Sequence, residues 1–220
     1  MAWTTPTNVA TGDVLTASRY NNEVVGNALA GGPIFAAYTD LVAAIPTPYE
    51  GQRAYLTAPL AATVTAAGDT TYVPTGISLI HNGSGWVCVT EVGAFTAAGG
   101  TYASGTYGPT LSGSPGTNPA VTTITGATAL VTITASVSIS TTMTVGIDVA
   151  ISGATTRLAG TTAGQNLNVP KSSDAGLAIT YNHSFIVSGL TAGVNVFTLN
   201  YNSNNTGTIT NRRLTVKGIA

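Results

Sequence analysis

The C-terminal part of the chain shows the clearest pattern, an alternation of apolar and polar residues. Over residues 129–139 every second residue is apolar, and apart from Leu130 the residues between them are threonine or serine. A period of two places the apolar side chains on one face of a β-strand. Further strand-like runs follow at 143–151, 177–187, 194–201 and 208–216. We therefore expect an antiparallel β-sandwich or jelly roll over residues 120–220.

A helix is expected near the N-terminus, over residues 17–30. Thr16 precedes it as an N-cap, and Tyr20, Val24 and Ala28 recur every four residues on one face. An isolated helix of this length is marginal in water. It must therefore dock on its own domain, on a sister chain or on a larger partner.

The pattern of residues 39–92 predicts a small β module. Residues 39–45 are expected to form one or two helical turns. The stretch Asn82–Gly85 is a strong hairpin signal between the apolar runs 77–81 and 86–89. The whole chain is thus expected to be mainly β, with a short helical segment in front of it.

The stretch 93–119 is rich in glycine, serine, threonine and proline. This composition favours a linker with long loops. The alternative is one short, edge-like strand pair laid against the following domain. The resulting division of the chain is 1–38, 39–92, 93–119 and 120–220.

Charge is scarce in this chain. Of its 220 residues only 7 are basic and 8 acidic, and none of the 56 residues between Glu91 and Asp148 is charged. Nucleic-acid binding requires lysines and arginines that neutralise phosphates, so this class of partner is excluded, as is polybasic binding to a membrane surface. Neither a membrane-spanning apolar run nor an export signal is expected. The 39 threonines give a surface of hydroxyls, which suits a subunit packed closely beside copies of itself.

No arrangement of residues supports catalysis. The acidic residues are dispersed, and Asp148 is expected on the polar face of a strand as a solvated or turn-bonded carboxylate. Cys88 is expected to be a packed small side chain, and His81, beside the hairpin turn, a solvated one. The chain contains no nucleophile elbow and no phosphate-binding loop. We expect no enzyme, no cofactor and no metal site.

Three residues of the C-terminal region are candidates for a trimer interface. His183 lies on the apolar face of its run and is interpreted as a core or interface histidine. Alternatively, three copies meet at an axis, where the imidazoles bind a metal or respond to pH. Arg212 and Arg213 are neighbours in the last strand and should point to opposite faces. One of them is expected to meet a carboxylate at a subunit interface, with two ordinary surface arginines as the alternative.

Three segments, in this order, resemble structural proteins of tailed-bacteriophage virions. The segment carrying Trp3-x-x-Pro6, Thr11–Ala17 and Tyr20-Asn21 resembles the N-terminal segment of phage minor tail, fibre and head-decoration proteins. A small module of phage fibres and appendages is similar to Ala43–Pro46, Glu50-Gly51, Tyr55-Leu56 and Asn82–Val87. The closing strands of trimeric phage jelly rolls, which share their shape with tumour-necrosis-factor and C1q heads, resemble Ser188–Gly193, Phe197–Tyr201 and Asn211–Leu214.

The resemblance implies a homotrimeric structural protein of the virion, assembled in the cytoplasm of the bacterial host. The expected function is that of a capsid decoration protein or short head fibre that stabilises the capsid. Its expected partners are sister chains, the major capsid protein or another virion protein, and a host cell-surface glycan. The expected virion anchor is the N-terminal segment with Trp3, Tyr20 and Val24. The alternative is a receptor-binding protein of the tail tip or baseplate, or a minor tail protein.

Overall fold

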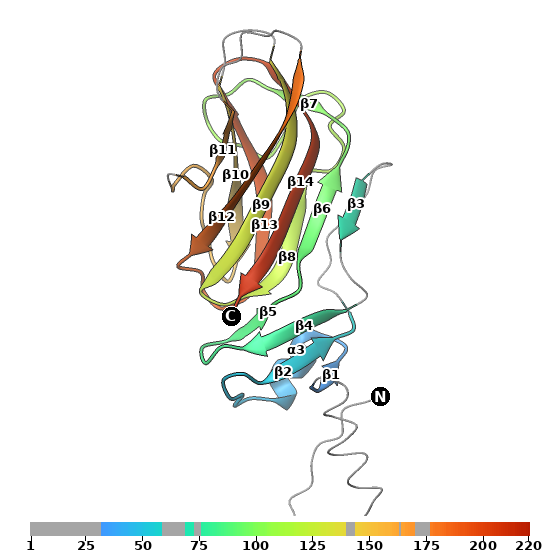
Figure 1. Cartoon of the computed structure of the whole chain (residues 1–220), viewed down its shortest axis with the longest axis vertical. Helices are drawn as coiled ribbons and strands as arrows, with labels where there is room; N and C mark the ends of the chain where they lie inside the picture. Colours follow the sequence, from blue (N-terminus) through green and yellow to red (C-terminus); the bar gives the residue numbers. More distant parts are fainter. Residues whose placement is uncertain (1–31, 59–68, 73–75, 140–143, 163, 170–176) are drawn as a thin grey trace, which may run out of the picture.

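The computed structural model of the chain describes residues 32–58, 69–72, 76–139, 144–162, 164–169 and 177–220 (Figure 1). Within these residues the fold is mainly β, with one short helix. The helix expected at 17–30 and the candidate anchoring residues Trp3, Tyr20 and Val24 lie outside the described residues. The anchoring role therefore stays a prediction.

The first part of the fold is a four-stranded sheet, called here the small sheet, with the strand order β1-β2-β4-β5. Its elements are β1 (Ile34–Phe35), α3 (Tyr38–Ala44), β2 (Arg53–Leu56), β4 (Ile77–His81) and β5 (Trp86–Cys88). Leu41 of α3 is fully buried and belongs to the same apolar cluster as Leu56 and Leu79 of the sheet. The helical turns expected at 39–45 are confirmed as α3. The expected hairpin around Asn82–Gly85 is confirmed as β4–β5.

Two larger sheets form the rest of the described chain, called here the two-sheet domain. The front sheet has the order β12-β9-β14-β6-β3, with β7 also paired to β14, and the back sheet has the order β11-β10-β13-β8 (Figure 1). The front strands are β3 (Asp69–Tyr72), β6 (Val92–Thr96), β7 (Gly100–Tyr102), β9 (Thr128–Ile139), β12 (Ala178–Ser188) and β14 (Gly207–Ile219). The back strands are β8 (Ala120–Thr125), β10 (Val145–Gly153), β11 (Leu167–Val169) and β13 (Gly193–Ser203).

The alternating pattern marks the core of this domain. The odd-numbered residues of β9 from Ala129 to Val137, and those of β10 from Val145 to Ile151, are all buried in one apolar cluster. Between them on β9, Thr132 and Thr134 point outward and share side-chain hydrogen bonds with β12, each 2.8 Å long. Because both sheets contribute their apolar faces to one core, the arrangement is consistent with a β-sandwich.

The domain begins earlier than the sequence predicts. β6 pairs with Arg212–Val216 of β14, and β7 pairs with Gly207–Ile209 of the same strand. These strands of the front sheet therefore begin before residue 120 and lie within 92–102, whereas residues 103–119 are mainly loop, as expected. The alternative prediction, a short strand pair laid against the following domain, is closer to the structure. The two strands, however, pair with β14 and not with each other. The sequence pattern does not predict β6 and β7, because the glycines and threonines at 93–101 give no alternation of apolar and polar residues.

The edge strand β12 departs from the simple inside–outside pattern. Its inward-facing residues Ile179, Tyr181 and His183 are only half-buried, whereas Phe185 and Val187 are buried. The neighbouring edge of the back sheet is β11, which has only three residues. An edge strand opposite so short a partner cannot be fully covered by it.

The small sheet packs against one end of the two-sheet domain through β5 (Figure 1). Two glycines allow this approach. A Cβ added at Gly218 or at Gly126 would lie 2.6 or 2.9 Å from a methyl group of Val87. Larger residues at either position would push the small sheet away from the domain.

Candidate functional site

Arg212 points into the domain because β14 contains a β-bulge. The pairing of β14 with β9 shifts register between Thr210 and Arg213, and Asn211 has a φ of 48°. A bulge inserts one residue and redirects the side chains that follow. Ile209 therefore faces inward before the bulge, and Arg212 and Leu214 face inward after it. Arg213 takes the outward position.

The guanidinium of Arg212 connects two strands to the segment between β6 and β8. Its Nη1 donates to the hydroxyl of Tyr201 at 3.1 Å and to Oδ1 of Asn118 at 3.4 Å. Its Nη2 donates to the carbonyl of Ala98 at 3.2 Å and to that of Pro115. Tyr201 in turn donates to Asn118 at 2.7 Å. Arg212 thus fixes the ends of a long segment against the core.

All of these acceptors are neutral, although Arg212 is only 1% exposed. The ring of Tyr201 lies 5.8 Å below the guanidinium carbon and provides a cation–π contact. Burial raises the pKa of Tyr201 to about 12, although Arg212 opposes this shift, so the phenol stays protonated. The expectation that Arg212 lies at a trimer interface is therefore wrong, because its own chain encloses the side chain.

The other two candidate interface residues remain accessible. Arg213 is half-buried on the outer face of the front sheet, with its guanidinium 5.5 Å from the ring centre of Phe95. His183 is also half-buried, stacks on Phe185 at 5.3 Å and bonds the carbonyl of Gly164 at 3.1 Å. Their place in a trimer interface stays a prediction.

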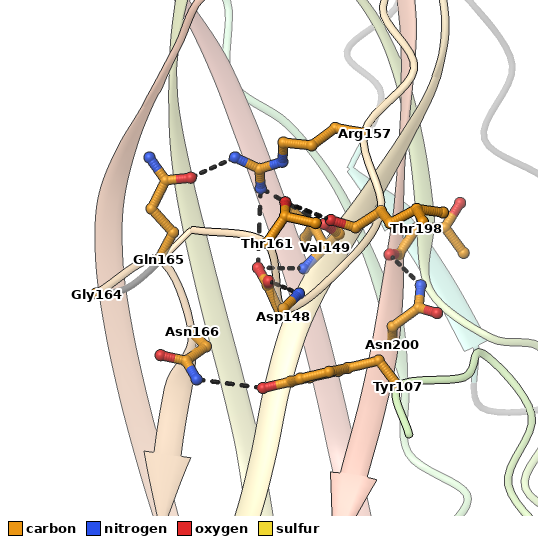
Figure 2. Close-up of polar contacts among 12 residues, drawn as sticks. Tyr107, Asp148, Val149, Arg157, Thr161, Gly164, Gln165, Asn166, Thr198 and Asn200 are labelled. Carbon is orange, nitrogen blue, oxygen red and sulfur yellow. Dashed lines mark hydrogen bonds and ion pairs between the residues drawn. The ribbon is translucent and has the colours of Figure 1, made fainter. Parts of the chain in front are cut away.

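A second polar cluster lies on the outer face of the back sheet, around Asp148 (Figure 2). Asp148 points outward from β10, yet it is 1% exposed because the loop between β10 and β11 covers it. Its carboxylate accepts the backbone N–H of Val149 at 2.7 Å and that of Gly160 at 2.6 Å. Nη2 of Arg157 lies 3.8 Å away. Of the two expected environments, the turn-bonded one is confirmed and the solvated one is wrong.

Arg157 links the Asp148 cluster to the front sheet through Gln165. Its Nη1 donates to the side chain of Gln165, and Nε2 of Gln165 donates to the carbonyl of Ile186 in β12 at 2.8 Å. The loop is thereby bonded to both sheets at the β11–β12 edge. Burial raises the pKa of Asp148, although its two N–H donors and Arg157 oppose the shift. Burial likewise lowers the pKa of Arg157.

Tyr107 covers the other side of this cluster. Nδ2 of Asn166 donates to its hydroxyl at 3.1 Å (Figure 2). A Cβ at Gly146 or Gly160 would lie 2.5 or 2.7 Å from Tyr107, so the phenol occupies space that two glycines leave open. The sequence pattern does not reveal Tyr107, Arg157 and Gln165, because they lie in two separate loops that meet at Asp148 only in the folded chain.

Of the two side chains of the small sheet singled out in the sequence, one differs in burial from the prediction. His81 was expected to be solvated but is 8% exposed, with its ring 5.5 Å from Trp86 in an edge-on arrangement. Cys88 is fully buried, as expected, and burial raises the pKa of its thiol. Both side chains are therefore buried.

The described residues include no group of three His, Cys, Asp or Glu side chains placed to hold a metal ion. No helix in the described part of the chain is long and apolar enough to cross a membrane. Comparison of the sequence with protein-family models and with curated proteins found no match.

Proposed function

We propose that this chain is a homotrimeric, non-enzymatic structural protein of a tailed-phage virion, with the two-sheet domain as a jelly-roll head. The favoured position is the capsid surface, as a decoration protein or short head fibre. The N-terminal segment attaches the trimer to the virion, and the small sheet forms its neck.

The strand order of the two-sheet domain carries this proposal. Counted from β6, its eight main strands are β6 and β8 to β14, and they lie in the orders β6-β14-β9-β12 and β8-β13-β10-β11. The first strand therefore neighbours the last, the second neighbours the seventh, the third neighbours the sixth, and the fourth neighbours the fifth. This nesting supports a jelly roll, in which an antiparallel ribbon folds over into two sheets. It agrees with the resemblance of the closing strands to trimeric phage heads.

The outer face of the front sheet is the surface that best fits a sister chain. Its residues on β9 and β12 are mostly threonine, serine and asparagine, and β9, β12 and β14 carry no carboxylate. Two apolar residues interrupt this polar face, Leu130 on β9 and Ile186 on β12, and they are direct cross-strand partners. Ile186 is 55% exposed. A sister chain packed here would bury this apolar pair without stranding a negative charge.

A trimer with this interface acts mechanically. It straddles neighbouring capsid subunits, adds buried area across their junctions and resists the pressure of packaged DNA. A receptor-binding protein of the tail would need exposed aromatic rings on which sugars stack, and Tyr201 cannot serve this purpose because its ring is fully buried.

Two measurements test the proposal. Light scattering of the purified chain should give the mass of a trimer, and Ile186→Asp should give a folded monomer. Leu158→Asp is the matched control, because Leu158 is 72% exposed on the loop between β10 and β11 and should leave the trimer intact. Copy number per virion then gives the position: hundreds of copies support decoration, whereas a few to some tens support the tail. A stable wild-type monomer, together with absence from virions, would overturn the proposal.

A further inference from the structure

The β4–β5 hairpin contains the dipeptide Asn82–Gly83 at its turn. An asparagine followed by glycine is chemically vulnerable, because the backbone nitrogen of the glycine can attack the side-chain amide carbon and no side chain hinders the approach. Gly83 has a φ of 86°, a conformation that favours glycine. The turn therefore favours glycine at position 83, and glycine is the residue that leaves its backbone nitrogen unhindered.

His81 places a base at this nitrogen. The backbone N–H of Gly83 donates to Nδ1 of His81, with a nitrogen–nitrogen distance of 3.3 Å. In this arrangement the lone pair of Nδ1 faces the N–H of Gly83. The ring is 8% exposed and packs edge-on against Trp86, which fixes its direction. A general base has to lie within hydrogen-bond reach of the proton it removes, and His81 satisfies that requirement.

Two backbone N–H groups face the side-chain oxygen of Asn82, the second group that takes part in the reaction. Oδ1 of Asn82 accepts the N–H of Ser84 at 3.2 Å and the N–H of Gly85 at 3.0 Å. Attack on the amide carbon moves negative charge onto this oxygen. Fixed N–H groups aimed at a developing oxyanion stabilise it, as in the oxyanion holes of acyl-transfer enzymes. The turn thus combines a nucleophile, its base and two oxyanion donors.

We propose that Asn82–Gly83 is a self-modification site, at which the folded hairpin converts Asn82 into aspartate or isoaspartate. The nitrogen of Gly83 bonds to Cγ of Asn82 while His81 takes its proton. The protonated imidazole then gives that proton to the departing amide nitrogen, which leaves as ammonia. The resulting five-membered imide is opened by water at either carbonyl, and this yields the two acidic products.

The change would act at the junction between the small sheet and the two-sheet domain. A Cβ at Gly126 would lie 2.7 Å from Nδ2 of Asn82, and a Cβ at Gly85 would lie 2.6 Å from that of Ala192. The hairpin tip therefore touches the turns at the lower end of the domain. Isoaspartate adds a backbone carbon and a negative charge there, so it should loosen this contact.

The test follows the hairpin peptide by mass spectrometry while the full-length protein ages at constant pH. We expect conversion at Asn82 to be faster in the folded protein than in the same protein in denaturant. His81→Phe keeps a ring against Trp86 but removes the base, and it should slow conversion by about 10²-fold. Asn82→Asp, which has no ammonia to lose, marks the elution of the aspartate product.

Two results would overturn the proposal. Conversion in the folded protein that is no faster than in denaturant would mean that the fold does not assist the reaction. Unchanged conversion in a folded His81→Phe variant would remove His81 as the base. If that variant does not fold, the comparison of folded and denatured wild type decides alone. Neither result would bear on the proposed virion role.

Discussion

The substitution Arg212→Met tests the buried arginine most directly. Methionine fills the space of the arginine stem but donates no hydrogen bond. Tyr201 and Asn118 keep the 2.7 Å bond between them, whereas the carbonyls of Ala98 and Pro115 lose their guanidinium donor. The segment between β6 and β8 then loses the bonds from the Arg212 side chain, although β7 within it stays paired with β14.

The expected cost follows from these two carbonyls. A buried acceptor without a donor costs about 1–3 kcal/mol, so the pair costs about 2–6 kcal/mol. Removal of a desolvated charge offsets part of this cost. We expect a net loss of about 2–4 kcal/mol in the free energy of unfolding. Domains of ordinary stability have about 5–15 kcal/mol in total.

Urea unfolding of the purified protein measures this loss, and Arg213→Met is the matched control. Arg213 is the next residue and lies on the outer face of the front sheet. Its substitution by methionine removes the same charge as Arg212→Met. Its replacement should cost less than about 1 kcal/mol. Equal losses for the two variants, or an Arg212→Met variant as stable as wild type, would refute the assigned role of the bulge and the inward guanidinium.

Three further predictions concern the core, the buried acid and the anchor. Ile133→Asp should unfold the two-sheet domain, because a carboxylate replaces a fully buried side chain, whereas Thr132→Asp should leave the circular dichroism spectrum unchanged. Burial raises the pKa of Asp148, so its contribution to stability falls as the pH rises through the raised value. The unfolding free energy of wild type minus that of Asp148→Asn should therefore decrease with rising pH, and an increase would mean that the two N–H donors and Arg157 together outweigh burial. Deletion of residues 1–30 should abolish virion attachment, scored by cosedimentation, and leave the two-sheet domain folded.

The core could be predicted from the sequence because a single physical rule determines it. Alternation over 129–139 identified the buried residues of β9, and Ile133 is fully buried as expected. The same rule failed at β6 and β7, where glycine and threonine leave no apolar period. It also failed at Arg212, because the bulge at Asn211 depends on the pairing of β14 with β9, which the chain pattern does not record.

The polar clusters could be predicted only in part. The carboxylate of Asp148 was expected on an outward face, which is where it lies, but its covering loop folds back from residues that have no pattern of their own. Arg157, Gln165 and Tyr107 come from two separate loops and meet only after the sheets have formed. The outward-facing pair Leu130 and Ile186 is visible in the sequence, because each residue interrupts an otherwise polar face.

The scarcity of charge and the placement of the remaining charges point to one organisation. Arg212 fixes the segment between β6 and β8, and the Asp148–Arg157 pair fixes the loop between β10 and β11 to both sheets. These charges lie inside, where they hold loops against the sheets. The outer face of β9 and β12 keeps neutral hydroxyls and amides, which neither repel an identical surface nor require a counter-ion when they are buried. In the proposed trimer, charges inside each chain would hold the long loops in place, while β9 and β12 present neutral side chains to a sister chain.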